Sequence, residues 1–158
     1  MKWLLGLTVA ALALALTACG SDQKATTQAG GVSGAAVSVA QNPAQGAILV
    51  DGKGHTLYLF EHDNGTTSAC TGACAQVWPA FTAGAAPTAG SGVDGSKLAT
   101  ADGQVAQQVT YNGHLLYSYS GDAAPGDVKG VGIPGWYPVS PSGAKVDKDD
   151  EGKSSGGY

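Results

Sequence analysis

Three cysteines are the residues of this 158-residue chain with the clearest capacity for covalent chemistry. Cys19 ends the run Leu16-Thr17-Ala18-Cys19, which is typical of a bacterial lipobox. The apolar stretch before it, after the basic Lys2, is too short to span a bilayer stably. We therefore expect residues 1–18 to be a signal peptide and Cys19 to carry a covalent lipid that holds the chain at a membrane. An ordinary secretory signal or a small membrane anchor is the alternative.

The other two cysteines, Cys70 and Cys74, flank Thr71-Gly72-Ala73. Export would place them in an oxidising compartment, so we expect a disulfide that closes a five-residue loop. Such a loop adds about 2 kcal/mol of stability by chain entropy, provided that the segment bends to bring the sulfurs together. The alternative is a redox pair or a soft-metal site, although the chain lacks both the Cys-x-x-Cys redox motif and the Cys-x-x-Cys-His motif of haem attachment.

Histidine and carboxylate side chains are the remaining candidates for metal or acid–base chemistry. His55 and His114 each follow a glycine and would become ligands if packing brought them together, while His62 lies beside Asp63 and could join a zinc or copper site. No pair has a recognised ligand spacing, so we predict no metal and no cofactor. Asp63 and Asp122 precede glycine-containing loops, where an Asx-type turn accounts for them. Catalysis would need their pKa values pushed apart, and we predict no catalytic residue.

The segments that position these residues read as β-strands separated by turns. Apolar and alternating residues at 44–50 and 55–61 flank a glycine-containing turn and predict a hairpin. Residues 104–111 and 114–120 flank Asn112-Gly113, which suits the two positive φ angles of a type I′ turn. A second hairpin is therefore expected.

The rest of the chain is predicted to connect and finish this framework. Residues 73–78 predict a short helical turn after the cysteine pair, ended by Pro79. Residues 83–103 are rich in small side chains and read as a long surface connection, and residues 136–140 read as a last strand. Because no helix rich in Ile or Leu is evident, aromatic side chains are expected to fill the core. A glycan- or quinone-stacking surface is the alternative if the rings are exposed.

The two hairpin segments are copies of one unit. With Gly54 set on Gly113, an offset of 59 residues aligns the flanking positions without a gap. The aligned pairs are His55 with His114, Leu57 with Leu116, Tyr58 with Tyr117, Phe60 with Tyr119, Asp63 with Asp122, Trp78 with Tyr137, and Pro79 with Pro138. Self-similarity at a fixed spacing indicates one supersecondary unit used twice. Because a lone hairpin is marginal in water, the two units must pack together to close a core.

These motifs resemble those of the bacterial secreted-repeat lipoproteins, which carry a Tyr-x-(Phe/Trp/Tyr)-x-x-Asp motif. The matching residues are Tyr58, Phe60 and Asp63 in the first copy and Tyr117, Tyr119 and Asp122 in the second. The family's Cys-x-Gly-x-Cys followed by a Trp-Pro step is matched by Cys70, Gly72, Cys74, Trp78 and Pro79. Ala80 stands where members usually carry a second proline. The resemblance covers about residues 46–143 and implies an exported, usually lipid-anchored protein of two repeats without a settled activity.

Composition narrows the possible functions. Only 13% of residues are charged, the eight basic residues are all lysines, and the formal net charge is −4. The absence of arginine and of a basic face argues against binding to nucleic acid, and the modest net charge provides no strong attraction for an anionic partner. The chain also lacks a Gly-x-Ser-x-Gly elbow, a P-loop, a dinucleotide-binding fingerprint and an EF-hand loop. We therefore expect a protein that is not an enzyme.

Together these observations predict a mostly β fold, with two pseudo-symmetric antiparallel hairpin repeats in one small domain. The expected organisation is a signal peptide at 1–18, a lipidated cysteine and flexible tether at 19–42, the β domain at 43–143 with repeats at about 44–102 and 103–143, and a disordered tail at 144–158. The predicted function is a lipid-anchored binding or scaffolding module on the extracytoplasmic side of a bacterial membrane, with an envelope protein or a small ligand as partner. The alternative is an envelope redox or metal-handling accessory that uses the Cys70–Cys74 loop and nearby histidines.

Overall fold

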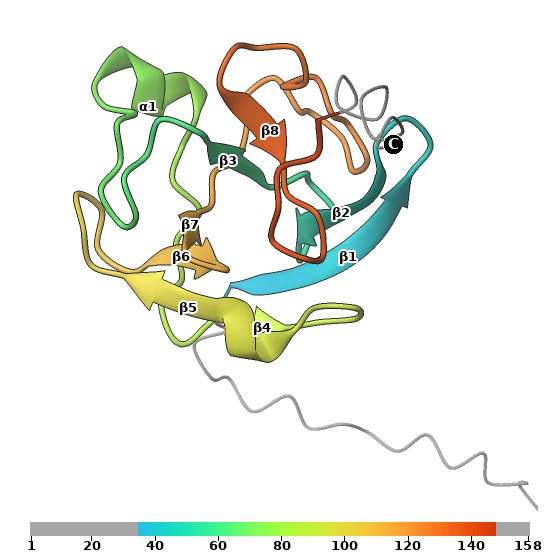
Figure 1. Cartoon of the computed structure of the whole chain (residues 1–158), viewed down its shortest axis with the longest axis horizontal. Helices are drawn as coiled ribbons and strands as arrows, with labels where there is room; N and C mark the ends of the chain where they lie inside the picture. The colour runs from blue at the N-terminus through green and yellow to red at the C-terminus, as the bar shows by residue number, and fades with distance from the viewer. Residues whose placement is uncertain (1–34, 148–158) are drawn as a thin grey trace, which may run out of the picture.

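Short strands joined by turns make up residues 35–147, the part of the chain that the computed structural model describes (Figure 1). The strands are β1 (Ala36–Asn42), β2 (Gly46–Asp51), β3 (Tyr58–Phe60), β4 (Thr88–Ala89), β5 (Leu98–Ala101), β6 (Gln108–Tyr111), β7 (His114–Leu115) and β8 (Trp136–Pro138). One helical turn, α1 (Ala73–Val77), and a 3₁₀ turn, η1 (Gly95–Lys97), lie between them. The strands form small sheets in the orders β2–β1–β4, β3–β8 and β5–β6–β7. The predicted mostly β fold is confirmed.

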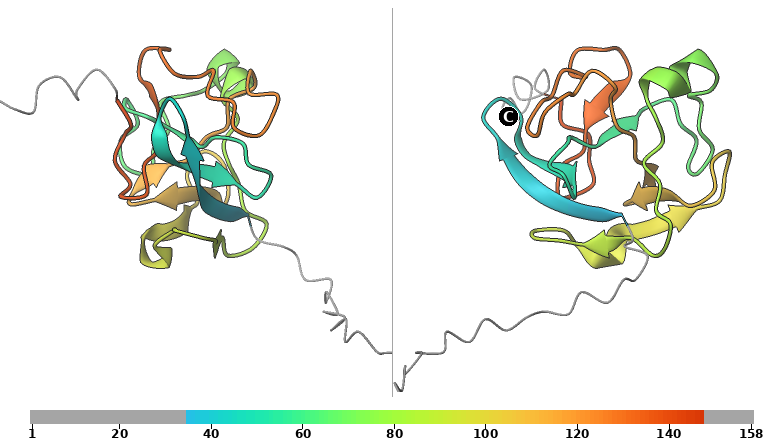
Figure 2. Two further views of the ribbon diagram at one scale, coloured as in Figure 1. Left: turned by 90° about the vertical axis from the view of Figure 1, so that its right-hand side faces the viewer. Right: turned by 180° about the vertical axis from the view of Figure 1, so that it is seen from behind.

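The first repeat opens with a hairpin that begins earlier than predicted. β1 pairs antiparallel with β2 from Val37 opposite Asp51 to Asn42 opposite Gly46, and it curves along one side of the molecule (Figures 1 and 2). The predicted tether at 19–42 is therefore wrong over β1. Most residues of β1 are small and give the strand little periodic signal, yet Val37 is fully buried. Positions 1–34 lie outside the described residues, and the predicted signal peptide and lipidated Cys19 fall among them.

The second repeat contains the predicted type I′ turn. Asn112 has a φ of 51° and Gly113 a φ of 82°, and this turn joins β6 to β7. β6 starts at Gln108 instead of the predicted 104, because the preceding residues form a turn in which the Gln107 N–H donates to Asp102 Oδ1. Residues 83–103, predicted as a surface connection, include β4, η1 and β5. β5 pairs with β6, so that prediction was wrong.

The two repeats exchange strands. Tyr58 and Tyr117 exchange two backbone hydrogen bonds of 2.9 Å. β3 of the first repeat pairs with β8 of the second. In the counterpart of this pairing, the end of the first repeat lies beside the second, and the Phe81 N–H donates to the Leu116 carbonyl. Within a repeat, the two strands of each predicted hairpin pair only next to the turn. An example is the bond that the Leu57 N–H donates to the Leu49 carbonyl. Each repeat therefore supplies strand partners to the other.

These backbone bonds correct the alignment of the repeats near their ends. The Ser120 N–H donates to the Val77 carbonyl, and the Glu61 N–H makes the equivalent bond to Gly135. Trp78 thus corresponds to Trp136. The ungapped offset of 59 residues wrongly paired it with Tyr137. The segment between the motif aspartate and this tryptophan is one residue shorter in the second repeat, which the ungapped comparison did not allow for.

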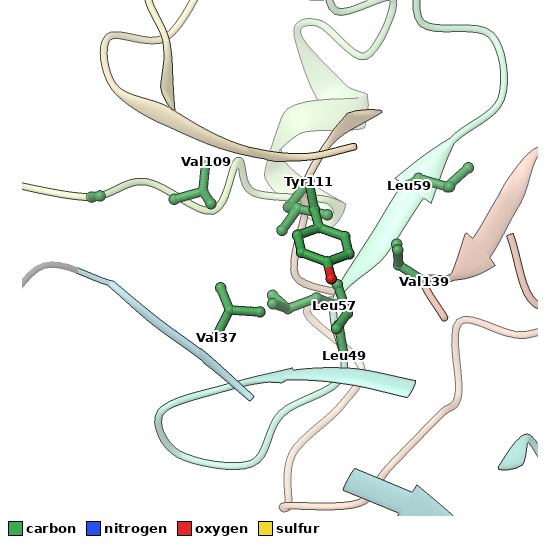
Figure 3. Packing of buried hydrophobic residues seen from close by; sticks show 9 residues of the cluster. Val37, Leu49, Leu57, Leu59, Val109, Tyr111 and Val139 are labelled. Atoms are coloured by element: carbon green, nitrogen blue, oxygen red, sulfur yellow. The ribbon is translucent and has the colours of Figure 1, made fainter. Parts of the chain in front are cut away.

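The interior consists of two hydrophobic clusters. The first is mainly aliphatic around the ring of Tyr111 (Figure 3); its buried members are Val37, Leu49, Leu57, Leu59, Ala83, Val109, Tyr111, Leu116 and Val139. The second is mainly aromatic; its buried members are Tyr58, Cys70, Trp78, Ala101, Leu115, Tyr117 and Trp136. Tyrosine and tryptophan rings from both repeats therefore fill much of the core, as expected from the sequence.

The end of the domain also lies further along the chain than predicted. The Val146 N–H donates to the Pro138 carbonyl at 2.8 Å, and Lys145 lies opposite Val139 in a bridge. Residues 144–147 are therefore part of the fold and not of the predicted tail. Positions 148–158 lie outside the described residues.

We predict that Trp136→Ala lowers the free energy of unfolding by about 3–5 kcal/mol, because it removes a large side chain that is only 4% exposed and leaves a cavity. Urea denaturation followed by circular dichroism measures the change. Val131→Ala, at a position 40% exposed, is the control and should change the stability by less than about 0.5 kcal/mol. Equal losses in the two variants would contradict this description of the core.

Candidate functional site

The two motif aspartates accept hydrogen bonds from the motif tyrosines of the opposite repeat. The Tyr58 hydroxyl donates to Asp122 Oδ2 at 2.7 Å, and the Tyr117 hydroxyl donates to Asp63 Oδ2 at 2.8 Å. Tyr58 lies on β3 and Tyr117 on the segment after β7, and both segments pair with the other repeat, which carries each hydroxyl to the other repeat's loop. We call these two contacts the crossed Tyr–Asp pairs.

The remaining carboxylate oxygens hold the loops that follow the motifs. Asp63 Oδ1 accepts the Ala69 N–H at 2.8 Å, and Asp122 Oδ1 accepts the Lys129 N–H at 2.8 Å. The backbone N–H of each aspartate donates to the carbonyl of the motif aromatic residue three positions earlier, at 3.1 Å. The expected turn role is thus partly met, but the side chains clamp backbone six and seven positions ahead, which is further than an Asx turn reaches.

Burial controls the ionisation of this network. It raises the pKa of Tyr117 to about 12, and it raises the pKa of Tyr58 further, with the Asp122 carboxylate adding to the effect. Burial also raises the pKa of Asp63, although the Ala69 N–H and the Tyr117 hydroxyl oppose this. At neutral pH the phenols are therefore protonated donors, which suits hydrogen bonding between the repeats.

Three polar groups around the tyrosine hydroxyls were not predicted from the sequence. The Gly130 N–H donates to the Tyr58 hydroxyl at 3.3 Å, and Ser68 Oγ lies 2.7 Å from the Tyr117 hydroxyl. Gln108 is buried, and its Nε2 donates to the Leu116 carbonyl at 3.0 Å. Gln108 begins β6, which reads Gln-Val-Thr-Tyr, and it directly follows Gln107, so no sequence signal distinguishes it. Ser68 and Gly130 lie in loops with no distinguishing pattern either.

Four aromatic rings form a stack where the repeats meet. Trp78 and Trp136 are parallel within 1°, with ring centroids 3.8 Å apart. Phe60 stacks on the outer side of Trp136 at 4.4 Å, and Tyr119 lies 4.4 Å from Trp78. Each tryptophan thus contacts the second aromatic residue of the other repeat's motif.

The cysteine pair forms the predicted disulfide. Cys70 and Cys74 are joined with an S–S distance of 2.03 Å. α1 spans Ala73–Val77, close to the helical turn predicted at 73–78, and Cys74 lies within it. Cys70 is buried in the aromatic cluster beside Trp78, whereas Cys74 is partly exposed. The bond therefore fixes the loop that carries Ser68 to Tyr117.

The structure gives the three histidines different neighbours. His55 Nδ1 lies 3.4 Å from Asp51 Oδ2, and the ring of His62 contacts Phe60 edge-on at 5.1 Å. His114 lies near enough to Asp63 to oppose the rise in its pKa. Within residues 35–147, no group of three His, Cys, Asp or Glu side chains is placed to hold a metal ion.

A pocket lies beside the tryptophan of each repeat. The larger, about 360 Å³, is lined by Val131, Ile133, Pro134, Trp136, Tyr137 and Pro138 among others. The smaller, about 220 Å³, is lined by Cys70, Trp78, Pro79, Val105, Gln108 and Tyr117 among others. The sequence singled out the Trp-Pro step that borders the smaller pocket, but it did not predict either pocket.

We predict that the free energy of unfolding falls as the pH rises above about 10. A pKa raised in the folded state stabilises the fold fully below the ordinary value of 10.0, and this contribution is lost as the pH rises through about 12 for Tyr117 and higher for Tyr58. Urea titrations between about pH 9 and about pH 12, with tyrosinate absorbance as a second signal, measure the loss.

The double variant Tyr58→Phe/Tyr117→Phe, which lacks both buried hydroxyls, is the control for this pH dependence. It should lose less stability than the unmodified protein across the same interval. An identical loss in both proteins would show that these two phenols do not cause it.

Comparison with known families agrees with the two-repeat geometry. A model of a family described as a secreted repeat of unknown function matches residues 39–82 and 100–140. No curated protein and no solved structure matches the chain. No helix within residues 35–147 is long and apolar enough to cross a membrane. A secreted family implies an extracellular or cell-envelope location. Because the matches span more than half of its length, the chain belongs to this family of secreted repeats of unknown function.

Proposed function

We propose that this protein is a lipid-anchored, non-enzymatic binding or scaffolding module on the extracytoplasmic side of a bacterial membrane. The observation that carries the proposal is that the motif side chains hold the fold together through hydrogen bonds inside the protein. The hydroxyls of Tyr58 and Tyr117 and the carboxylates of Asp122 and Asp63 are engaged with one another and with loop backbone. A motif that joins two repeats supports a rigid module whose outer surface meets a partner.

The surface beside the tryptophan stack supports a binding role. The pocket of about 360 Å³ next to Tyr137 has a size that suits a small ligand or a side chain of a protein partner. Val77 and Val131 are large apolar residues that are 43% and 40% exposed. These features suit recognition of an envelope protein or a small ligand better than of nucleic acid, because the chain carries no arginine.

The proposed anchor is tested by labelling with an alkyne analogue of palmitate in a bacterial host. The full chain should incorporate the label and fractionate with membranes, because Leu16-Thr17-Ala18-Cys19 fits a lipobox. Cys19→Ala should incorporate no label and should accumulate as the unprocessed precursor. A Cys70→Ala/Cys74→Ala variant should be labelled like the unmodified chain. A processed, unlabelled and soluble full chain would contradict the anchor.

A redox or metal-handling role for the Cys70–Cys74 loop is the competing proposal. The partial exposure of Cys74 and the pocket beside Cys70 favour it, since a reductant or metal needs access. Thiol titration and metal analysis of purified protein separate the two proposals. Absence of free thiols and of bound copper or zinc supports the scaffold, whereas free thiols with bound metal support the competing role.

A further inference from the structure

We propose that the free edge of β5 pairs with β5 of a second copy of this chain, forming an antiparallel dimer centred on Thr100. The inference names a partner for the proposed scaffolding role. It rests on the proposed function, because the proposed membrane anchor brings the two copies together. β5 lies along the lower border of the molecule in Figure 1, with β6 on its inner side.

Comparison of the repeats shows that this edge is left open in only one of them. β1 and β5 are equivalent strands, since each is the antiparallel partner of the strand that leads to its repeat's turn. The outer edge of β1 is covered: the Gly90 N–H donates to the Val37 carbonyl, and the Val39 N–H donates to the Ser91 carbonyl. β5 is the end strand of its sheet, and no other strand of residues 35–147 pairs with its outer edge.

Hydrogen-bonding groups point outward from this edge at alternate residues. The Asn112 N–H donates to the Lys97 carbonyl, so the backbone groups of Ala99 face β6 as well, and those of Leu98 and Thr100 face away. Leu98 uses its N–H within η1, where it donates to the Gly95 carbonyl, but its carbonyl remains available. Ala99 and Thr100 are both exposed.

One antiparallel register uses these groups. With Thr100 opposite Thr100 of the second copy, the two residues exchange two hydrogen bonds. Each Leu98 carbonyl then accepts the Asp102 N–H of the other copy, because alternation places that N–H outward too.

Two features that usually prevent edge pairing, charge and proline, are absent from this strand. Leu98–Ala101 contains no charged residue and no proline. Because the edge is only four residues long, the contact is weak in free solution. Anchoring two copies in one membrane raises their effective concentration, which makes a weak and reversible contact useful at a surface.

Cysteine cross-linking in membranes tests the register to one residue. In the proposed dimer the two Thr100 Cα atoms are about 5.5 Å apart, which suits a disulfide. Ala99 lies opposite Ala101 of the second copy, so the two Ala99 Cα atoms are about 8 Å apart, which is too far. Under mild oxidation of membranes that contain the full chain, Thr100→Cys should give a dimer on non-reducing gels, and Ala99→Cys should give at least several-fold less.

Three controls accompany this comparison: the unmodified chain, thermal melting and the palmitate label. The unmodified chain reports any cross-link through Cys19, and thermal melting verifies that both exposed substitutions leave the fold intact. Equal cross-linking of Thr100→Cys and Ala99→Cys, or none, in membranes that carry the palmitate label would overturn the dimer while leaving the anchor in place. Absence of the label would instead count against the anchor. In that case the same comparison in concentrated purified protein decides the dimer.

Discussion

The crossed Tyr–Asp pairs are the constraint on which the rest of this structure depends. A buried phenol or carboxylate without a partner costs about 1–3 kcal/mol or more, so neither repeat can bury its own motif alone. Each repeat holds the acceptor for the other's tyrosine, and the shared backbone bonds between Tyr58 and Tyr117 bring the two motifs into place. The aromatic stack also needs both repeats, because Phe60 and Tyr119 each lie against the tryptophan of the other repeat.

The two repeats secure equivalent loops by different chemistry. In the first, the Cys70–Cys74 disulfide holds the loop, and Ser68 approaches the Tyr117 hydroxyl. In the second, Asp127 Oδ2 accepts the backbone N–H groups of Ala123 and Ala124 and lies 2.7 Å from Lys129 Nζ. A covalent bond in one loop and a hydrogen-bonded carboxylate in the other thus serve the same tyrosine–aspartate geometry.

Much of the fold follows from local sequence, but its strand partners do not. Asn112-Gly113 predicts its turn because only certain residues adopt two successive positive φ angles. Alternation in residues 55–61 predicts a strand and its two faces, yet the same pattern is satisfied whether the partner is in its own repeat or in the other. The repeat motif predicted that Tyr58 and Asp122 are important, but it did not predict that they contact each other. β1 was assigned to the tether because strands of small residues lack a strong periodic signal.

A double-mutant cycle on the tyrosine–aspartate contacts tests the crossed arrangement most directly. Unfolding free energies of Tyr58→Phe, Asp122→Asn and the double variant give the coupling energy of that pair, and the same is measured for Tyr58 with Asp63. The crossed arrangement predicts a coupling of about 1–3 kcal/mol for Tyr58 with Asp122, and less than about 0.5 kcal/mol for Tyr58 with Asp63 of its own repeat. Strong coupling of Tyr58 to Asp63 and none to Asp122 would contradict it.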